Sequence, residues 1–163
     1  MAARVLLPSR QASRTDHWSE HLCLTVTPAG RAALGDLDAR ASMVAVLRLG
    51  TRPLAWRQAV ERLVVQFDRS APECSRLLIA AETHGWLSVS VQSPQAPFSA
   101  ADFLRRSGLL SEARVDALAR RLLPDAPLDI RSLARELAAV GWLRKAEAGF
   151  LGRLGSHTTW QWD

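Results

Sequence analysis

The chain has 163 residues, of which 48% are apolar and 23% are charged, and its formal net charge is +5. This composition is typical of a globular protein that buries a core without disulfides, and it excludes a disordered chain. The longest strongly apolar stretches, residues 63–65 and 77–81, are far too short to cross a bilayer, so we expect no membrane insertion. Cys23 and Cys74 have no CxxC neighbour, which predicts buried thiols in a reducing, cytoplasmic compartment and no zinc site.

Residues 1–20 are predicted to form a basic flexible arm. They are rich in arginine and contain serine, and no acidic residue precedes Asp16. The same composition fits a transit peptide. We favour the arm, because the chain uses arginine almost to the exclusion of lysine, a bias typical of a GC-rich bacterial genome.

Residues 21–92 are predicted to form a winged-helix-like unit. Residues 21–27 alternate between apolar and polar side chains, as a half-buried strand does. Residues 28–30 form a turn, and residues 31–34 could return as the second strand of a small β-hairpin. Three helices are then expected, near residues 39–49, over residues 53–67 and over residues 70–84.

The third of these helices has the clearest start and end. Ser70 as N-cap and Glu73 three residues later form a capping box, and Pro72 lies in the first turn. Gly85 ends the helix, and residues 86–92 then alternate as a strand with one wet face does. The order strand, three helices, strand is that of a winged helix.

Residues 93–98 are the predicted linker, because they contain two prolines and no charge. Residues 99–155 are predicted to form a second, helical unit. Helices are expected to start at the capping residues Ser99, Asp102, Ser111 and Asp129, and Gly108 is expected to end the first of them. A short helix is also expected over residues 146–154. The aromatic tail, residues 156–163, alternates and could add an edge strand or cover a surface. The predicted fold class is therefore mainly α, of α+β type.

The two units share one motif. Residues 74–81 run into Gly85-Trp86-Leu87, and residues 130–137 run into Gly141-Trp142-Leu143 at the same spacing. Both copies place apolar residues at i, i+3, i+4 and i+7, and both end in glycine followed by two large apolar residues. The repeat predicts related helices and contains no side chain that could carry out catalysis.

No set of residues in the sequence predicts catalysis, a metal or a cofactor. His17 and His21 have i,i+4 spacing around Glu20, which is close to the pentad of inverted zinc peptidases. That pentad needs a helix and a third ligand, whereas residues 22–27 predict a strand and no third ligand stands out. We expect a protein that is not an enzyme, and a small enzyme that uses these histidines is the last alternative.

DNA binding is the main alternative to a binding role toward proteins. The third helix of a winged helix enters the major groove, but here it would expose Arg76 beside Glu73 and Glu82. The second copy is more basic, and its candidates for nucleic-acid contacts are Arg131, Arg135, Arg144 and Lys145. A solvated helix face would explain the same residues.

Trp160 and Trp162 share one face of the predicted tail strand. Exposed aromatic residues are typical hot spots of protein interfaces, so both are candidates for partner binding. The alternative is that they fold back and seal the core.

Residues 21–91 resemble the small winged-helix domains of the PqqD family and related recognition domains of ribosomal-peptide maturation. The resemblance rests on the order of elements and on Arg76-Leu77-Leu78 with His84-Gly85-Trp86-Leu87. It implies that a leader peptide is bound as an added strand beside the third helix. The groove would then lie between a strand edge at Leu22, Leu24 and Val26 and the helix from Arg76 to Glu82.

Residues 99–154 resemble helical accessory modules beside bacterial Ser/Thr kinases and the N-terminal domains of secretion ATPases. The motifs that carry this resemblance are residues 103–111, residues 133–137 and Gly141-Trp142-Leu143. Such modules bind other proteins without catalysis. Together the two resemblances predict a non-enzymatic adaptor or accessory subunit of a larger bacterial assembly that binds a protein or peptide. The alternative is a winged-helix transcriptional regulator that binds DNA.

Overall fold

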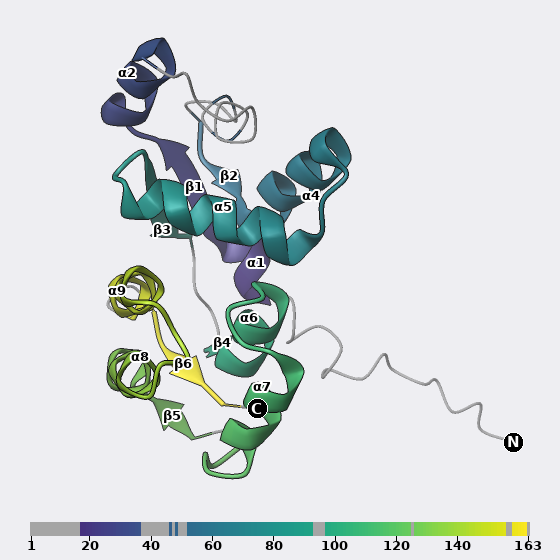
Figure 1. The fold of residues 1–163 in the computed structure, drawn as a ribbon, viewed down its shortest axis with the longest axis vertical. Coiled ribbons are helices and arrows are strands. Elements are labelled where there is room, and N and C mark those ends of the chain that lie inside the picture. The colour runs from purple at the N-terminus through teal and green to yellow at the C-terminus, as the bar shows by residue number, and fades with distance from the viewer. Residues whose placement is uncertain are drawn as a thin grey trace, which may run out of the picture.

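Two small three-stranded sheets lie among eight helices in the part of the chain that the computed structural model describes (Figure 1). That part comprises residues 17–36, 46, 48, 52–92, 97–124, 126–155 and 158–162. The helices are α1 (His17–His21), α2 (Pro28–Asp36), α4 (Trp56–Phe67), α5 (Ala71–Thr83), α6 (Ala100–Arg106), α7 (Glu112–Ala119), α8 (Ile130–Ala139) and α9 (Lys145–Leu154). The strands are β1 (Leu22–Val26), β2 (Leu54–Ala55), β3 (Leu87–Val91), β4 (Phe98–Ser99), β5 (Pro127–Leu128) and β6 (Trp160–Gln161).

The first sheet has the order β2-β1-β3, and both pairings are antiparallel. The strands predicted over residues 21–27 and 86–92 are confirmed as β1 and β3. However, β1 is the central strand, so the prediction that it offers a free edge is wrong. Its register against β3 places Leu24 opposite Val89, and Leu24 is buried.

The predicted return strand over residues 31–34 is also wrong, because these residues belong to α2. Pro28 occupies the first helical position, and the Thr27 hydroxyl accepts a hydrogen bond from the Gly30 N–H at 3.1 Å, which caps the helix start. Gly30 packs closely on the neighbouring turn, since a Cβ there would lie 2.4 Å from the Trp86 carbonyl oxygen. The expected β-hairpin is therefore replaced by a strand followed by a capped helix.

Several predicted segments fall outside the described residues. These are residues 1–16 of the basic arm, the helix expected near 39–49 apart from Val46 and Arg48, and residues 93–96 of the linker. Residues 17–20 of the predicted flexible arm are instead part of α1, and Trp18 is buried in the core, so the prediction is wrong for them.

The other predicted helices are confirmed, and the helix predicted over residues 53–67 is α4, which begins at Trp56 directly after β2. Ser70 and Glu73 form the capping box of α5, with both hydrogen bonds at 3.3 Å. Ser99, Ser111 and Asp129 accept backbone hydrogen bonds at the starts of α6, α7 and α8. The short helix predicted over residues 146–154 is α9, which begins one residue earlier.

The second sheet has the order β4-β6-β5, with β6 parallel to β4 and antiparallel to β5. The tail therefore supplies the central strand of this sheet, and the prediction of an edge strand is wrong. The two short strands beside it, β4 and β5, were not predicted. Trp160 and Trp162 are each 2% exposed, so the alternative that they seal the core is confirmed.

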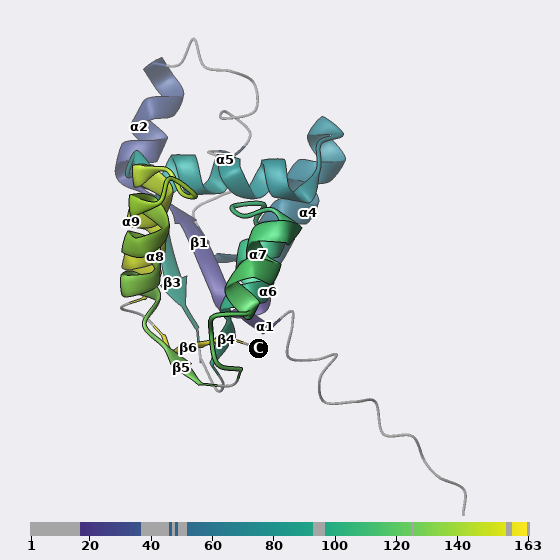
Figure 2. The same ribbon diagram turned by 60° about the horizontal axis from the view of Figure 1, so that its bottom comes forward.

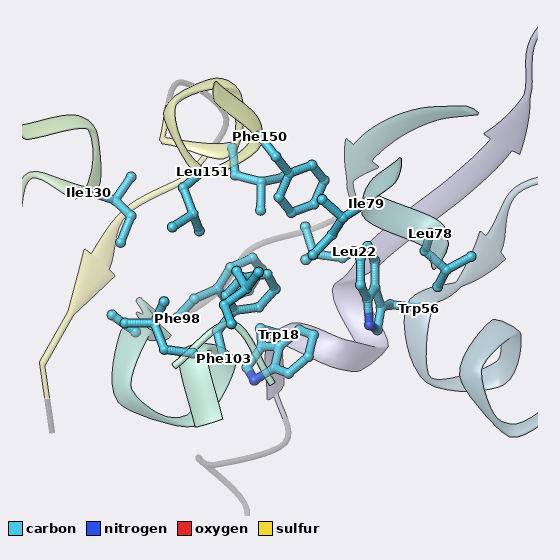
Figure 3. Close-up of a cluster of buried hydrophobic side chains, with 14 of the residues drawn as sticks. Trp18, Leu22, Trp56, Leu78, Ile79, Phe98, Phe103, Ile130, Phe150 and Leu151 are labelled. Atoms are coloured by element: carbon cyan, nitrogen blue, oxygen red, sulfur yellow. The ribbon is translucent and has the colours of Figure 1, made fainter. Parts of the chain in front are cut away.

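A single hydrophobic cluster runs through both sheets (Figure 3). Trp18 and Trp56 from the first half meet Phe103 and Phe150 from the second. The ring centroids are 4.7 Å apart for Trp18–Phe103 and 5.9 Å apart for Trp56–Phe150. The Trp18 indole N–H also donates to the buried Asp102 carboxylate at 2.7 Å. The regions predicted as two units are thus joined by one core.

Candidate functional site

An open groove of about 960 Å³ lies between β3 and the helix pair α8–α9. Figure 2 shows these two helices beside β3, with the end of α5 above them. We call it the β3 groove and define it by Leu87 and Val89 of β3, Arg131 and Arg135 of α8, and Lys145 and Gly152 of α9.

The strand wall of the β3 groove presents unpaired backbone groups. The Thr27 N–H donates to the Trp86 carbonyl and the Gln92 N–H donates to the His21 carbonyl, each at 2.9 Å. In an antiparallel ladder such pairs alternate with pairs whose backbone groups point away from the partner strand. By this register, Leu87, Val89 and Val91 direct their N–H and C=O groups toward the outer edge of β3. No strand within the described ranges pairs with that edge.

The helix wall is open because α9 has small residues along one face. Ala148, Gly149 and Gly152 line the groove. A Cβ built on Gly152 would meet nothing within 4 Å, so this position faces free space. The Arg131 Nε–H donates to the Gly152 carbonyl at 3.0 Å and holds α8 against α9.

The β3 groove is strongly basic. Its charged lining residues are Glu82, Arg131, Arg135, Lys145 and Arg153. Glu82 accepts two hydrogen bonds from the Arg153 guanidinium, at 2.7 and 2.5 Å, and these raise the pKa of Arg153. The only acidic side chain among these residues is therefore neutralised, which leaves a net positive charge in the groove.

Three of the four residues predicted for nucleic-acid contacts meet in this groove, namely Arg131, Arg135 and Lys145. Arg144 does not line it, and its side chain is 90% exposed. Neither Arg135 nor Lys145 has an ion-pair partner among the residues whose positions are described. These two side chains are the available cations of the site.

The residues predicted for peptide binding are dispersed. Leu22, Leu24 and Val26 lie in the central strand and are at most 4% exposed. The Arg76 guanidinium donates to the Gly108 carbonyl at 2.7 Å, so it ties α5 to the second half of the chain. Of the predicted set, Glu82 alone borders the β3 groove.

Sequence reasoning missed the open edge of β3 and the small residues of α9. The open edge cannot be predicted from the sequence, because an alternating pattern predicts a strand but does not show which other strands pair with it. The run Lys145, Ala148, Gly149 and Gly152 has i, i+3, i+4 and i+7 spacing, which could have indicated a thin helix face.

His17 and His21 lie in one helix, α1, as the zinc-peptidase pentad requires, so the objection that this segment is not helical is wrong. His21 Nδ1 lies 2.8 Å from the Gln92 carbonyl oxygen. No group of three metal-ligating side chains occurs in the described part of the chain. In the same part, every helix is too short or too polar to cross a membrane.

A second cavity, of about 470 Å³, lies between α1, α4 and the start of α5. Three arginines border it, Arg57, Arg105 and Arg106, and each is already paired with a carboxylate. The Trp56 indole N–H is buried and has no hydrogen-bond partner among the residues that the structure describes. Because its cations are paired, this cavity is a weaker candidate than the β3 groove.

Comparison of the chain with protein-family models, curated proteins and solved structures found no match.

Proposed function

We propose that this protein is a non-enzymatic adaptor that binds an extended peptide segment of a partner protein along the outer edge of β3. The observation that carries the proposal is the outward-facing backbone of Val89, on the β3 edge that borders the β3 groove; Leu87 shares this register but is only 3% exposed. An unpaired strand edge is a template for an added strand, and the backbone hydrogen bonds supply affinity.

The apolar part of the groove supports the same function. Val89 is half-buried at the edge, and the small residues of α9 leave room beside it for the side chains of an added strand. Pockets for alternate side chains give such complexes their specificity. The mode is that implied by the resemblance to PqqD-like domains, but the helix wall is formed by α8 and α9 in place of the third helix.

The position of α5 disfavours the alternative of a winged helix that reads DNA. A recognition helix must expose one face to the major groove. Here Arg76 donates to Gly108 and Glu82 pairs with Arg153, so two polar side chains of α5 are engaged by the second half of the chain. We therefore rank peptide binding first.

The test is a proline substitution that removes only an outward donor. Val89→Pro deletes one outer-edge N–H, and proline is tolerated on edge strands where the N–H faces solvent. Val89→Ala is the control, because it shortens the side chain and keeps the N–H. A phage-displayed library of random 12-residue peptides is the probe, since it needs no known partner.

We expect the wild type and Val89→Ala to enrich peptides from the library, and Val89→Pro to lose the enrichment. Circular dichroism and thermal melting check that the proline variant stays folded. Failure of the wild type to enrich any peptide, or equal enrichment by a folded Val89→Pro protein, would contradict strand addition.

A further inference from the structure

We infer that the segment bound in the β3 groove is acidic, with Asp or Glu side chains that pair with Arg135 and Lys145. The inference rests on the proposed function and adds the chemistry of the partner. It follows from the charge of the groove rather than from the strand edge.

The charge of the groove is one-sided. Four cationic side chains line it against one carboxylate, and that carboxylate is held by Arg153 through two hydrogen bonds. Arg131 is in turn engaged with the Gly152 carbonyl. A neutral or basic peptide would leave the remaining cations near an apolar wall without counter-charges, whereas an acidic peptide would pair with them.

The available cations lie on the helix wall opposite the strand edge. Arg135 projects from the middle of α8, and Lys145 starts α9. A peptide hydrogen-bonded to the outward groups of Val89 would therefore have β3 on one side and the two cations on the other. Guanidinium groups bind carboxylates in a planar, two-pronged geometry, which favours Asp and Glu at this position.

Part of the groove surface is apolar, which limits how uniformly acidic the segment can be. Val89, Ala138 and Ala148 are half-buried in the lining. An apolar side chain of the segment would cover them, since burying apolar area is favourable. We expect a segment in which acidic residues are mixed with small or medium apolar residues.

A nucleic acid would offer anionic groups to the same cations. It would leave the unpaired backbone groups of β3 without the partner that a peptide strand provides. This difference makes the peptide the better occupant and makes DNA binding an explicit outcome of the test.

The experiment repeats the peptide selection with a charge-reversed groove. The variant is Arg135→Glu with Lys145→Glu. Arg62→Glu with Arg69→Glu is the control, because both positions are exposed, neither lines the groove, and the change in net charge is the same. A fluorescent 20-base-pair DNA duplex is measured in parallel.

We expect the wild type and the control to enrich acidic peptides, and the charge-reversed groove to enrich basic ones. For a selected acidic peptide, affinity should fall about 100-fold in the charge-reversed variant and stay within about twofold in the control. It should also weaken as salt is raised.

Three results would overturn the inference in different ways. Peptides that depend on the Val89 N–H but carry no excess of acidic residues would refute the acidic partner and leave strand addition standing. No enrichment by any protein would refute the proposed function and the acidic partner together. Salt-sensitive binding of the duplex, lost on charge reversal and accompanied by no peptide binding, would assign the groove to nucleic acid.

Discussion

The two copies of the repeated motif end their helices in the same geometry and then lead into different elements. Gly85 after α5 and Gly141 after α8 adopt φ values of +76° and +79°. The next leucines along the chain, Leu87 and Leu143, are both buried, at 3% and 5% exposed. The motif therefore specifies how a helix stops and how the chain returns to the core, and nothing more.

The tryptophans of the motif show where the copies begin to differ. Both are half-buried, and the N–H of each donates back into its own helix at about the same distance, 3.0 Å for Trp86 and 2.9 Å for Trp142. Trp86 then stacks on His84 of its own turn, whereas Trp142 receives Arg114 from α7 over its ring. The contacts of each tryptophan ring are therefore set by the residues packed around it and are not shared by the two copies of the motif.

The elements that succeed the two motifs form the two walls of the β3 groove. Leu87–Val91 form β3 with one open edge, while Lys145–Leu154 form α9 against α8. The strand wall comes from the first copy and the helix wall from the second. The groove therefore forms because the two similar helix ends are followed by different elements, a strand in one copy and a helix in the other.

The largest expected effect comes from the shared core of the two copies. Leu78 of α5 and Leu137 of α8 lie on the buried faces of the two helices and are at most 1% exposed in one cluster. Each Leu→Ala variant should lose about 2–5 kcal/mol of unfolding free energy. Both should unfold in one cooperative transition, followed by tryptophan fluorescence and far-UV circular dichroism in urea. Two separate transitions in either variant would show that the copies belong to independent cores.

A smaller and equal effect is expected at the two glycine stops. A Cβ on Gly85 or Gly141 would meet nothing within 4 Å, so Gly→Ala costs only the left-handed backbone, about 1–2 kcal/mol at each site. Gly108 is the contrasting control, because at φ +69° its Cβ would also lie 2.5 Å from the Pro72 Cβ. Urea unfolding should rank Gly108→Ala as the most damaging of the three. A cost at Gly85 that differs clearly from that at Gly141 would break the equivalence of the motifs.

The ion pair that links the copies should contribute less. Glu82 of α5 is 12% exposed and Arg153 of α9 is 49% exposed at the side chain. A double-mutant cycle with Glu82→Gln and Arg153→Gln should give a coupling energy of about 1 kcal/mol, the upper end for partly exposed pairs. The control cycle is the exposed pair Arg57–Glu61 on α4, which should couple by about 0.3–0.5 kcal/mol. Equal coupling in both cycles would mean that the inter-copy pair is an ordinary surface contact.

The helices were predictable because their signals are local. The capping residues Ser70, Ser99, Ser111 and Asp129 act within three residues of themselves, and all four start helices as expected. The helix α2 is harder to predict, because Pro28-Ala29-Gly30 is typical of a turn, although Thr27 before it can cap a helix.

The sheets and the site depend on contacts that sequence patterns do not encode. Strands of two residues, such as β2, β4 and β5, are too short to show alternation. Arg131, Arg135 and Lys145 were recognised as a basic group, but their position opposite the β3 edge depends on how α9 packs against α5. The burial of Trp160 depends on β4 and β5, which lie far away in the sequence.

The smallest expected effect on stability is the pH dependence that the Asp129 cap gives to α8, since the corresponding helix α5 is capped by the uncharged Ser70. The Asp129 carboxylate that starts α8 accepts hydrogen bonds from the N–H groups of Arg131 and Ser132 and from the Ser132 hydroxyl. The Ser132 hydrogen bonds are the main cause that lowers the pKa of Asp129 below its ordinary value. Because the folded pKa is the lower one, the charged cap stabilises the fold above the unfolded pKa, and this contribution is lost as the pH falls through the folded pKa.

The measurement compares the melting temperatures of the wild type and Asp129→Asn from about pH 6 down to about pH 2. Asparagine keeps an acceptor at the helix start but does not titrate over this range. We expect the wild type to be the more stable protein at the upper end and its advantage to disappear as Asp129 becomes protonated. A Ser111→Ala variant, which removes the uncharged cap of α7, should show a loss that does not vary with pH. The prediction is contradicted if the difference in melting temperature between the wild type and Asp129→Asn is the same at about pH 2 as at about pH 6. The difference would then come from a poor fit of the amide at this helix start, and the charge of Asp129 would contribute nothing to stability.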